Sequence, residues 1–380
     1  YGDMNAVKPA SPDLTHLKYE TITSNNIGVD FGLFSDKVNF TFELYKKVTD
    51  DLLQKKMKVP SSTGLSTVAW YNSGKIQNKG WEFNIDIAAV KTKDWSFNFG
   101  FNISQNKNEI LELPENKNDE LYTFGNKNYA YSVMMGDPLG SFYGYRYKGV
   151  YQNVEETYAV NTSGQRILDI DGNPVVMKNG DQKVYPGDAR YEDVNGDGVI
   201  DENDIVYLGN SNPTLTGGLN FTLRYKKVSL VAAFHGRAGQ KVINQARMDM
   251  ENMRGKNNQS VAVLRRWRSE GDDTDIPRAL YDKGYNYLGS DRFVEDASFL
   301  RLKTVTLKYQ MPAKWMKAIG VNKLELYATG YDMFVWTKYK GQDPEVNLKA
   351  ANDGTVAQVA IDSNNTPKPF KIAFGLNLNF

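Results

Sequence analysis

Apolar and polar residues alternate with a period of two along most of this chain, which makes the β-strand its structural unit. In the segment 81–89 the odd positions carry Trp, Phe, Ile, Ile and Ala, and the even positions begin with Glu, Asn and Asp. Because successive side chains of a strand point to opposite faces, each such strand has one apolar and one polar face. The segments of this kind are 27–33, 38–44, 81–89, 95–103, 215–225, 228–234, 299–309, 324–334 and 370–380.

The lengths of these strands and of their connections indicate a membrane barrel. Strands in soluble sheets usually have about five or six residues, whereas a tilted strand needs about 9–11 residues to cross a bilayer. Short turns at one end of a sheet and long loops at the other are typical of outer-membrane barrels, and a sandwich would distribute its loops more evenly. The short connections are 34–38, 90–95, 225–228 and 310–321, and the long ones are 48–79, 106–139, 236–298 and 334–369. We therefore predict an all-β fold, a transmembrane antiparallel β-barrel with long extracellular loops.

The segment 141–151 also alternates, but counting it as one barrel strand breaks the order of strand directions before position 215. Either a second strand lies within 151–213, or 141–151 belongs to a large external loop.

The ends of the predicted sheet require strands from elsewhere, because unpaired backbone groups in hydrocarbon cost several kcal/mol each. The chain starts at Tyr1 without a signal peptide and ends on an alternating segment at Phe380. We therefore expect residues 1–380 to be the C-terminal portion of a longer polypeptide.

The composition argues against several classes of protein. A formal net charge of +1 provides no field that would gather nucleic acid, and the absence of cysteine excludes disulfides, thiolate metal sites and cysteine nucleophiles. The two histidines, His16 and His235, do not form a metal-ligand spacing, and the chain has no serine-nucleophile, P-loop or dinucleotide motif. The longest apolar run, 230–234, is far too short for a membrane-spanning helix. We expect no enzyme activity.

One motif, at 193–204, resembles the calcium loop of an EF-hand. Oxygen donors occupy positions 1, 3, 5, 9 and 12, a glycine occupies position 6, and position 7 offers a backbone carbonyl. The predicted ligands are Asp193, Asn195, Asp197, Val199, Asp201 and Asp204. Position 12 is Asp instead of Glu, so bidentate closure of the site is less assured. We predict a structural Ca²⁺ site, and the alternative is a Gly/Asn/Asp turn that needs no metal.

Aromatic residues within the predicted loops are candidates for cargo binding, because exposed rings can stack on sugars or hold peptide side chains. The candidates are Trp70, Tyr71, Trp267, Tyr285 and Tyr287. The alternative is that they pack within their own loops or form the aromatic girdle of a barrel.

Several blocks, in order along the chain, resemble one family. They are GSFYGYRYKGVYQN (140–153), the block 186–230, ASFLRLKTVTLKYQMP (297–312), the block 324–346 and FGLNLNF (374–380). In these blocks the chain resembles the C-terminal barrel half of the SusC/RagA-type TonB-dependent outer-membrane transporters of Bacteroidetes.

The resemblance implies a multi-pass barrel of 22 strands in the bacterial outer membrane, with a plug domain that lies outside residues 1–380. It also implies import of a bulky nutrient, a glycan or an oligopeptide, together with a SusD-like surface lipoprotein. Energy would come from TonB acting on the missing part, and outer-membrane lipid would surround the wall. The alternative function is a surface β-protein with a calcium-stabilised loop that acts as a binding or structural module.

Overall fold

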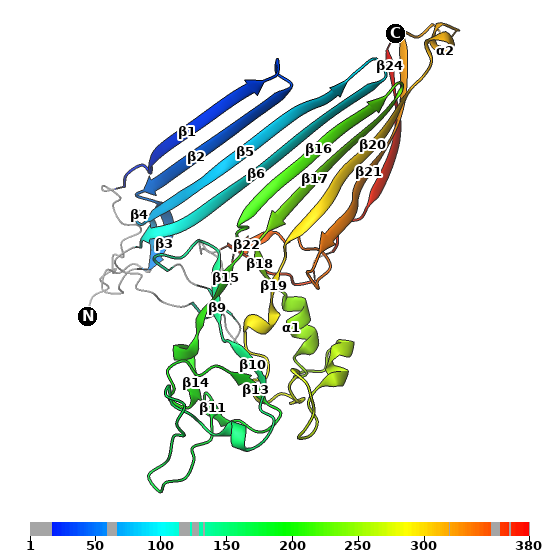
Figure 1. Cartoon of the computed structure of the whole chain (residues 1–380). Coiled ribbons are helices and arrows are strands. Elements are labelled where there is room, and N and C mark those ends of the chain that lie inside the picture. The colour runs from blue at the N-terminus through cyan, green and yellow to red at the C-terminus, as the bar shows by residue number, and fades with distance from the viewer. Residues whose placement is uncertain are drawn as a thin grey trace, which may run out of the picture.

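The computed structural model describes residues 17–58, 67–113, 122–123, 129–131, 134–318, 320–350, 358–364 and 366–379. Its main feature is a nine-stranded antiparallel sheet in which each strand pairs with its neighbours in chain order (Figure 1). The strands are β1 (Thr21–Leu33), β2 (Val38–Asp50), β5 (Lys75–Lys91), β6 (Trp95–Glu112), β16 (Leu215–Tyr225), β17 (Val228–Ala238), β20 (Phe299–Gln310), β21 (Lys323–Thr337) and β24 (Lys371–Asn379). Every alternating segment of the sequence forms one of these strands, although Phe380 lies outside the described residues.

The two faces of the sheet differ in polarity as the alternation predicts. One register row across β2, β5 and β6 joins Phe42, Phe83 and Ile103, and the row beside it, on the opposite face, joins Thr41, Asn84 and Asn102. Within the described part of the chain nothing covers the apolar face, and the exposed fraction is 72% for Ile27 and 82% for Phe374. Burial of apolar side chains is the main force that stabilises folded proteins, so this face requires a lipid environment.

The sheet is an open portion of a barrel wall. Within the described residues, β1 pairs only with β2, and β24 pairs only with β21. Both edges therefore present unpaired backbone groups that further strands must satisfy.

The connections separate into short and long ones at opposite ends of the sheet (Figure 1). At one end, tight turns join β1 to β2, β5 to β6 and β16 to β17, and the short helix α2 (Ala313–Ala318) lies between β20 and β21. At the other end are the long excursions, of which the first contains the hairpin of β3 (Leu53–Lys58) and β4 (Thr67–Asn72). In the described residues, no helix has the length and apolarity needed to cross a lipid bilayer.

Two of the long excursions, residues 134–214 and 239–298, fold together into a body that we call the loop assembly (Figure 1). Its strands are β9 (Ser141–Gly144), β10 (Tyr147–Val150), β11 (Lys178–Asn179), β12 (Gln182–Lys183), β13 (Ala189–Tyr191), β14 (Val199–Ile200), β15 (Val206–Asn210), β18 (Lys241–Ile243) and β19 (Val294–Asp296), and its helix is α1 (Gln245–Glu251). Single-turn 3₁₀ helices lie at Glu155–Thr157, Glu202–Asp204, Val261–Arg265 and Asp291–Phe293. The remaining short strands are β7 (Tyr122–Thr123) and β8 (Ala130–Tyr131), which pair beside β9, and β22 (Leu348–Ala350) and β23 (Gln358–Ala360), which pair with each other.

The segment 141–151 belongs to this loop assembly. It forms β9 and β10, which pair in small sheets with β15 and β13 and not in the nine-stranded wall. Of the two alternatives that the sequence leaves open, the structure supports the second to this extent: 141–151 belongs to a large loop and is not a strand of the wall.

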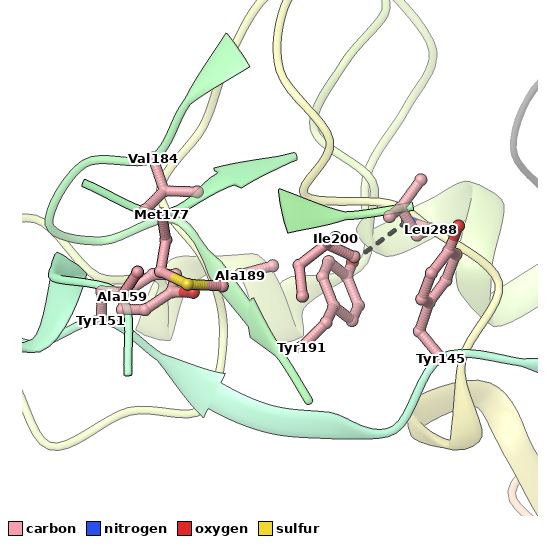
Figure 2. Close-up of a cluster of buried hydrophobic side chains, with 9 residues drawn as sticks. All are labelled: Tyr145, Tyr151, Ala159, Met177, Val184, Ala189, Tyr191, Ile200 and Leu288. Carbon is pink, nitrogen blue, oxygen red and sulfur yellow. Dashed lines mark hydrogen bonds between the residues drawn. The ribbon is translucent and has the colours of Figure 1, made fainter. Parts of the chain in front are cut away.

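A packed hydrophobic core lies in the loop assembly and not in the sheet. Figure 2 shows nine side chains of one cluster, of which eight belong to the first excursion and one, Leu288, belongs to the second. The Tyr191 hydroxyl donates to the carbonyl oxygen of Tyr285 and accepts from the backbone N–H of Leu288, each at 3.1 Å. This pairing removes the cost of burying a phenol oxygen, and it links excursions that are far apart in the sequence.

Candidate functional site

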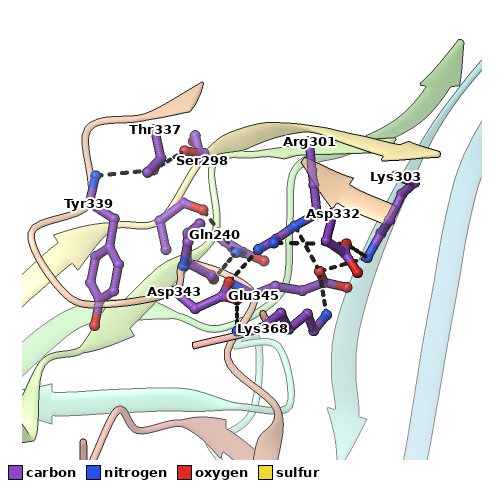
Figure 3. A network of polar contacts seen from close by, with 12 residues as sticks. Gln240, Ser298, Arg301, Lys303, Asp332, Thr337, Tyr339, Asp343, Glu345 and Lys368 are labelled. Carbon is purple, nitrogen blue, oxygen red and sulfur yellow. Dashed lines mark hydrogen bonds and ion pairs between the residues drawn. The ribbon is translucent and has the colours of Figure 1, made fainter. Parts of the chain in front are cut away.

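Six charged side chains join the polar face of the wall to the excursion that follows β21; we call them the ion cluster (Figure 3). They are Arg301, Lys303, Asp332, Asp343, Glu345 and Lys368, three cations and three anions. Arg301 is 3% exposed; its guanidinium pairs with Asp343 and, at 3.4 Å, with Glu345. The Glu345 carboxylate also accepts from Lys303 Nζ at 3.0 Å and pairs with Lys368 Nζ at 2.6 Å.

These contacts determine the ionisation of Glu345. Burial alone would raise the pKa of its carboxyl group, but the hydrogen bonds from Lys368 and Lys303 outweigh burial and lower the pKa from 4.5 to about 2. The carboxylate therefore stays charged at neutral pH and holds the excursion against the wall.

The sequence pattern alone misses the ion cluster because a β-bulge shifts the alternation. In β20 the register skips one residue at Lys303, with Leu302 opposite Phe234 and Thr304 opposite Ala233. Uninterrupted alternation from 299 to 309 would place Arg301 on the same face as the apolar side chains. The extra residue moves Arg301 to the polar face, as β-bulges do.

The predicted calcium loop is a closed turn held by its own side chains. The Asp193 carboxylate accepts from the backbone N–H groups of Gly196 at 2.7 Å and Gly198 at 2.8 Å. Both glycines have positive φ, 71° and 86°, a conformation that favours glycine at these positions. Asp197 Oδ1 accepts from the N–H of Val199 at 2.8 Å.

The last two carboxylates of the motif close the loop from the other end. Asp204 is fully buried; its Oδ1 accepts from Val194 N–H at 2.7 Å and its Oδ2 from Asp201 N–H at 2.9 Å. Asp201 in turn caps the 3₁₀ helix by accepting from Asn203 N–H at 2.8 Å. Burial raises the pKa of Asp204 above its ordinary value.

The fit of a metal ion to this loop rests on the remaining lone pairs. An ionised carboxylate has about four acceptor sites, so backbone hydrogen bonds leave capacity on Asp193, Asp197 and Asp204. Within the described ranges, no group of three or more acidic or histidine side chains is arranged to surround an ion. The structure brings the predicted ligands into one loop, with a glycine where the sharp turn needs it. Backbone N–H groups donate hydrogen bonds to the carboxylate oxygens of the loop.

Three of the predicted aromatic residues lie in the loop assembly. The Trp267 ring covers Gly187 so closely that a Cβ there would lie 2.2 Å from its Cε3 atom. The Tyr285 hydroxyl donates to Asp181 Oδ1 at 3.1 Å, and the Tyr287 ring lies 4.6 Å from the guanidinium carbon of Arg254. All three side chains are half-buried and keep part of their surface open to solvent.

The other two, Trp70 and Tyr71, lie on a separate hairpin. They belong to β4, where they pair with Lys55 and Gln54 of β3. In Figure 1 this hairpin lies beside β2 and β5 and away from the loop assembly. The five predicted aromatic residues therefore do not form one patch.

A salt bridge connects the two halves of the loop assembly, and no pattern in the sequence predicts it. Asp188, with 8% of its side chain exposed, accepts from Arg278 Nε at 2.7 Å and from the Asn286 side-chain amide at 3.3 Å. The Asn286 carbonyl oxygen accepts from the N–H of Ala189 at 2.8 Å. These bonds satisfy buried polar groups that come from both excursions.

The chain is similar to several known proteins that share one description. Residues 1–174 match the family described as "TonB dependent receptor-like, beta-barrel". The chain is 32% identical to TonB-dependent receptor P26 of Formosa agariphila over 98% of this chain and 36% of that protein. It is 28% identical to TonB-dependent receptor SusC of Bacteroides thetaiotaomicron over 96% of this chain and 32% of that protein. The chain thus spans about a third of the length of these relatives.

The fold is similar to that of a solved structure described as the RagAB peptide transporter. The TM-score is 0.71 at 23% identity, over 95% of this chain and 35% of that one. The same assembly described in an open-open state gives a TM-score of 0.70 at 21% identity.

Proposed function

We propose that this chain is a transmembrane β-barrel portion of a SusC/RagA-type TonB-dependent receptor of the bacterial outer membrane, and that the whole protein imports a bulky nutrient. The cargo is a glycan or an oligopeptide, and the energy comes from TonB acting on a part outside residues 1–380.

One observation carries the proposal: the wall has an uncovered apolar face, a polar opposite face, and a folded loop assembly at one end only. In outer-membrane barrels the long loops face outward and the short turns face the periplasm. The loop assembly therefore lies at the outer mouth, where cargo arrives, and the polar face lines the passage. The rival function, a water-soluble surface module, is disfavoured because Ile27, Phe374 and their neighbours would remain exposed to water.

We assign the capture of cargo to the half-buried aromatic side chains at this end. Trp267, Tyr285 and Tyr287 are held in place by the loop assembly, and Trp70 and Tyr71 form a second group on their hairpin. Rings fixed in this way bind with little loss of conformational entropy. The relatives are described as receptors and transporters, which supports binding and transport without catalysis.

A SusD-like lipoprotein is the proposed partner on the outer surface. Supporting observations are the relationship to SusC and an exposed apolar hairpin in the loop assembly, where Leu168 is 55% exposed and Ile170 is completely exposed. A partner that covers these two side chains would remove their apolar surface from water. Replacing Ile170→Asp in the whole protein is expected to reduce co-purification of the lipoprotein, and Asp171→Ala, beside it, is the control. Equal recovery with both variants would contradict this assignment.

The loop 193–204 is proposed to bind a structural Ca²⁺ that rigidifies the loop assembly. Asp193, Asn195, Asp197, Asp201 and Asp204 would supply side-chain oxygens, and Val199 its carbonyl oxygen. The supporting observation is the ligand spacing together with a turn already formed around Gly198.

The import proposal is tested by uptake into cells that carry the whole protein. Fluorescent mixtures of oligosaccharides and of oligopeptides are supplied separately, with and without a protonophore that removes the energy source of TonB. We expect one of the two classes to accumulate in an energy-dependent manner, and accumulation to fall in a Trp267→Ala/Tyr287→Ala variant. Absence of energy-dependent uptake of both classes would contradict the proposal.

A further inference from the structure

Three lysines form a continuous row on the apolar face of the wall. Lys46 of β2 lies opposite Lys79 of β5, and Lys79 lies opposite Lys107 of β6. On the other side, Lys46 lies opposite Asn25 of β1. Residues directly opposite one another in a sheet point to the same face, and neighbouring strands are about 4.8 Å apart. The row therefore concentrates three positive charges within about 10 Å.

The row marks the outer border of the membrane-facing band. One step toward the short-turn end, the same face carries Leu44 and Trp81, and the next row carries Phe42, Phe83 and Ile103. The lysines are thus the first charged row that follows the apolar rows toward the loop end of the sheet. In an outer-membrane barrel this height is the headgroup region of the outer leaflet.

The positive charge of the row is not balanced within the described part of the chain. Lys46 and Lys79 make no ion pair there, and Lys107, 63% exposed, reaches only Glu109 of its own strand at 3.7 Å. By contrast, Lys75, at the loop end of β5, pairs with both Asp50 and Glu112. Like charges directly opposite each other destabilise a sheet, so an unbalanced row calls for an anionic group from outside the chain.

The surface around the row has the shape and polarity for an amphipathic ligand. A shallow hollow of about 500 Å³ is lined by the three lysines and, below them, by Ile27, Leu44 and Trp81. The Trp81 ring is fixed because its Nε1 donates to Gln105 Oε1 at 2.7 Å. A ligand here would place an anionic head against the lysines and an acyl chain along the apolar side chains.

We propose that this row is a binding site for the phosphate-bearing headgroup of an anionic lipid in the outer leaflet of the outer membrane. Lys46, Lys79 and Lys107 bind the phosphate oxygens, and Ile27, Leu44 and Trp81 contact the first acyl carbons. The bound lipid neutralises the lysine row and fixes the height of the wall in the membrane. The site is independent of cargo binding, because it lies on the face opposite the passage.

The test uses the whole protein purified in a neutral detergent, with diphosphoryl lipid A as the probe and its dephosphorylated form as the neutral counterpart. Binding is measured by native mass spectrometry. The variant Lys46→Gln/Lys79→Gln/Lys107→Gln is expected to bind diphosphoryl lipid A at least about tenfold more weakly, since each basic side chain near a membrane surface contributes about 1 kcal/mol. This variant removes repulsion between strands, so it is expected to fold.

The matched control, Lys37→Gln/Lys91→Gln/Lys227→Gln, removes the same charge from exposed lysines at the short-turn end. Its binding is expected to stay within about twofold of that of the unaltered protein. The proposal is overturned if both triple variants lose binding equally, if the dephosphorylated lipid binds as well as the phosphorylated one, or if millimolar inorganic phosphate displaces the lipid completely, which would indicate a site for free anions.

Discussion

Arg278 and Asp188, 90 residues apart in the sequence, form a hydrogen-bonded ion pair at 2.7 Å inside the loop assembly. Two wall strands, β16 and β17, separate their excursions along the chain. The pair lies next to the hydrophobic cluster, because Asn286 bonds both to the Asp188 carboxylate and to the N–H of the buried Ala189. The excursions 134–214 and 239–298 therefore form one folded body and not two independent loops.

Replacing Arg278 is expected to weaken the packing of the loop assembly without unfolding the wall. Arg278→Ala leaves the Asp188 carboxylate buried without its cation, with only the Asn286 amide and the backbone N–H of Tyr185 as donors, at a cost of about 1–3 kcal/mol. Hydrogen exchange of backbone amides in 140–213 should accelerate accordingly, while exchange in β5 and β6 stays unchanged. The exposed Lys283→Ala is the control. Unchanged exchange in Arg278→Ala would mean that the ion pair does not hold the two excursions together.

The placement of Trp267 leads to a prediction about two glycines. Gly187→Ala introduces a Cβ into the Trp267 ring at a position with φ of +84°, whereas Gly164→Ala adds a Cβ at φ of +76° with open space around it. Both substitutions place an alanine in a backbone conformation that favours glycine, but only Gly187→Ala must also displace the ring. Gly187→Ala should therefore destabilise the loop assembly by more than about 1 kcal/mol beyond the effect of Gly164→Ala. Protease susceptibility of 262–290 provides the measurement. Equal susceptibility of the two variants would refute the packing of Trp267 on Gly187.

The ion cluster leads to a prediction about the stability of its contacts at low pH. The pKa of Glu345 in the folded protein, about 2, lies below its ordinary value of 4.5. A depressed carboxyl pKa contributes stability that is fully present above the ordinary value and is lost as the pH falls toward the folded value. Contacts of 338–350 and 366–370 with the wall should therefore weaken between about pH 4.5 and pH 2.

Pepsin cleavage within 338–350 and 366–370, compared at pH 4.5 and pH 2.5 in the whole protein, measures this opening. Glu345→Gln, which cannot titrate, should be cleaved more readily at pH 4.5 and show a smaller pH dependence. If cleavage of Glu345→Gln depends on pH as strongly as cleavage of the unaltered protein, another group controls the opening.

The proposed calcium loop predicts a response to the ion itself. Calcium at a concentration well above the dissociation constant should protect 193–204 from proteolysis, because a ligand that binds only the folded loop stabilises it. Asp193→Ala should abolish that protection. Asp169→Ala, in a neighbouring turn where Asp169 accepts from the N–H groups of Asp171 and Asn173, should not. Equal protection with and without calcium would identify the motif as a metal-free turn.

Much of the wall is readable from the sequence because its physical signal is local. Alternation places residues such as Phe83 and Asn84 on opposite faces, and the short turns identify one end of the sheet. The bulge at Lys303 is not readable, because its position is set by pairing with β17 and β21. For the same reason the ion cluster around Arg301 has no sequence signal.

The loop assembly is hard to derive from the sequence because its contacts lack a period. The pairing of Asp188 with Arg278 depends on how two distant excursions pack, and so does the hydrogen bond from the Tyr191 hydroxyl to the carbonyl oxygen of Tyr285. The calcium motif is the exception, since a contiguous run of donors folds locally around Asp193. Residue type identifies the aromatic candidates, but only the fold shows that Trp70 and Trp267 lie apart.

The measurement that tests the account most directly is the environment of neighbouring residues in one wall strand of the whole protein in native outer membranes. The 380 residues contain no cysteine, so Phe83→Cys and Asn84→Cys each introduce one reporter within them. A spin label at position 83 should be accessible to oxygen dissolved in the bilayer, and a label at position 84 to a water-soluble nickel complex. Reversed or equal accessibility at the two positions would contradict a wall with lipid on one face and an aqueous passage on the other.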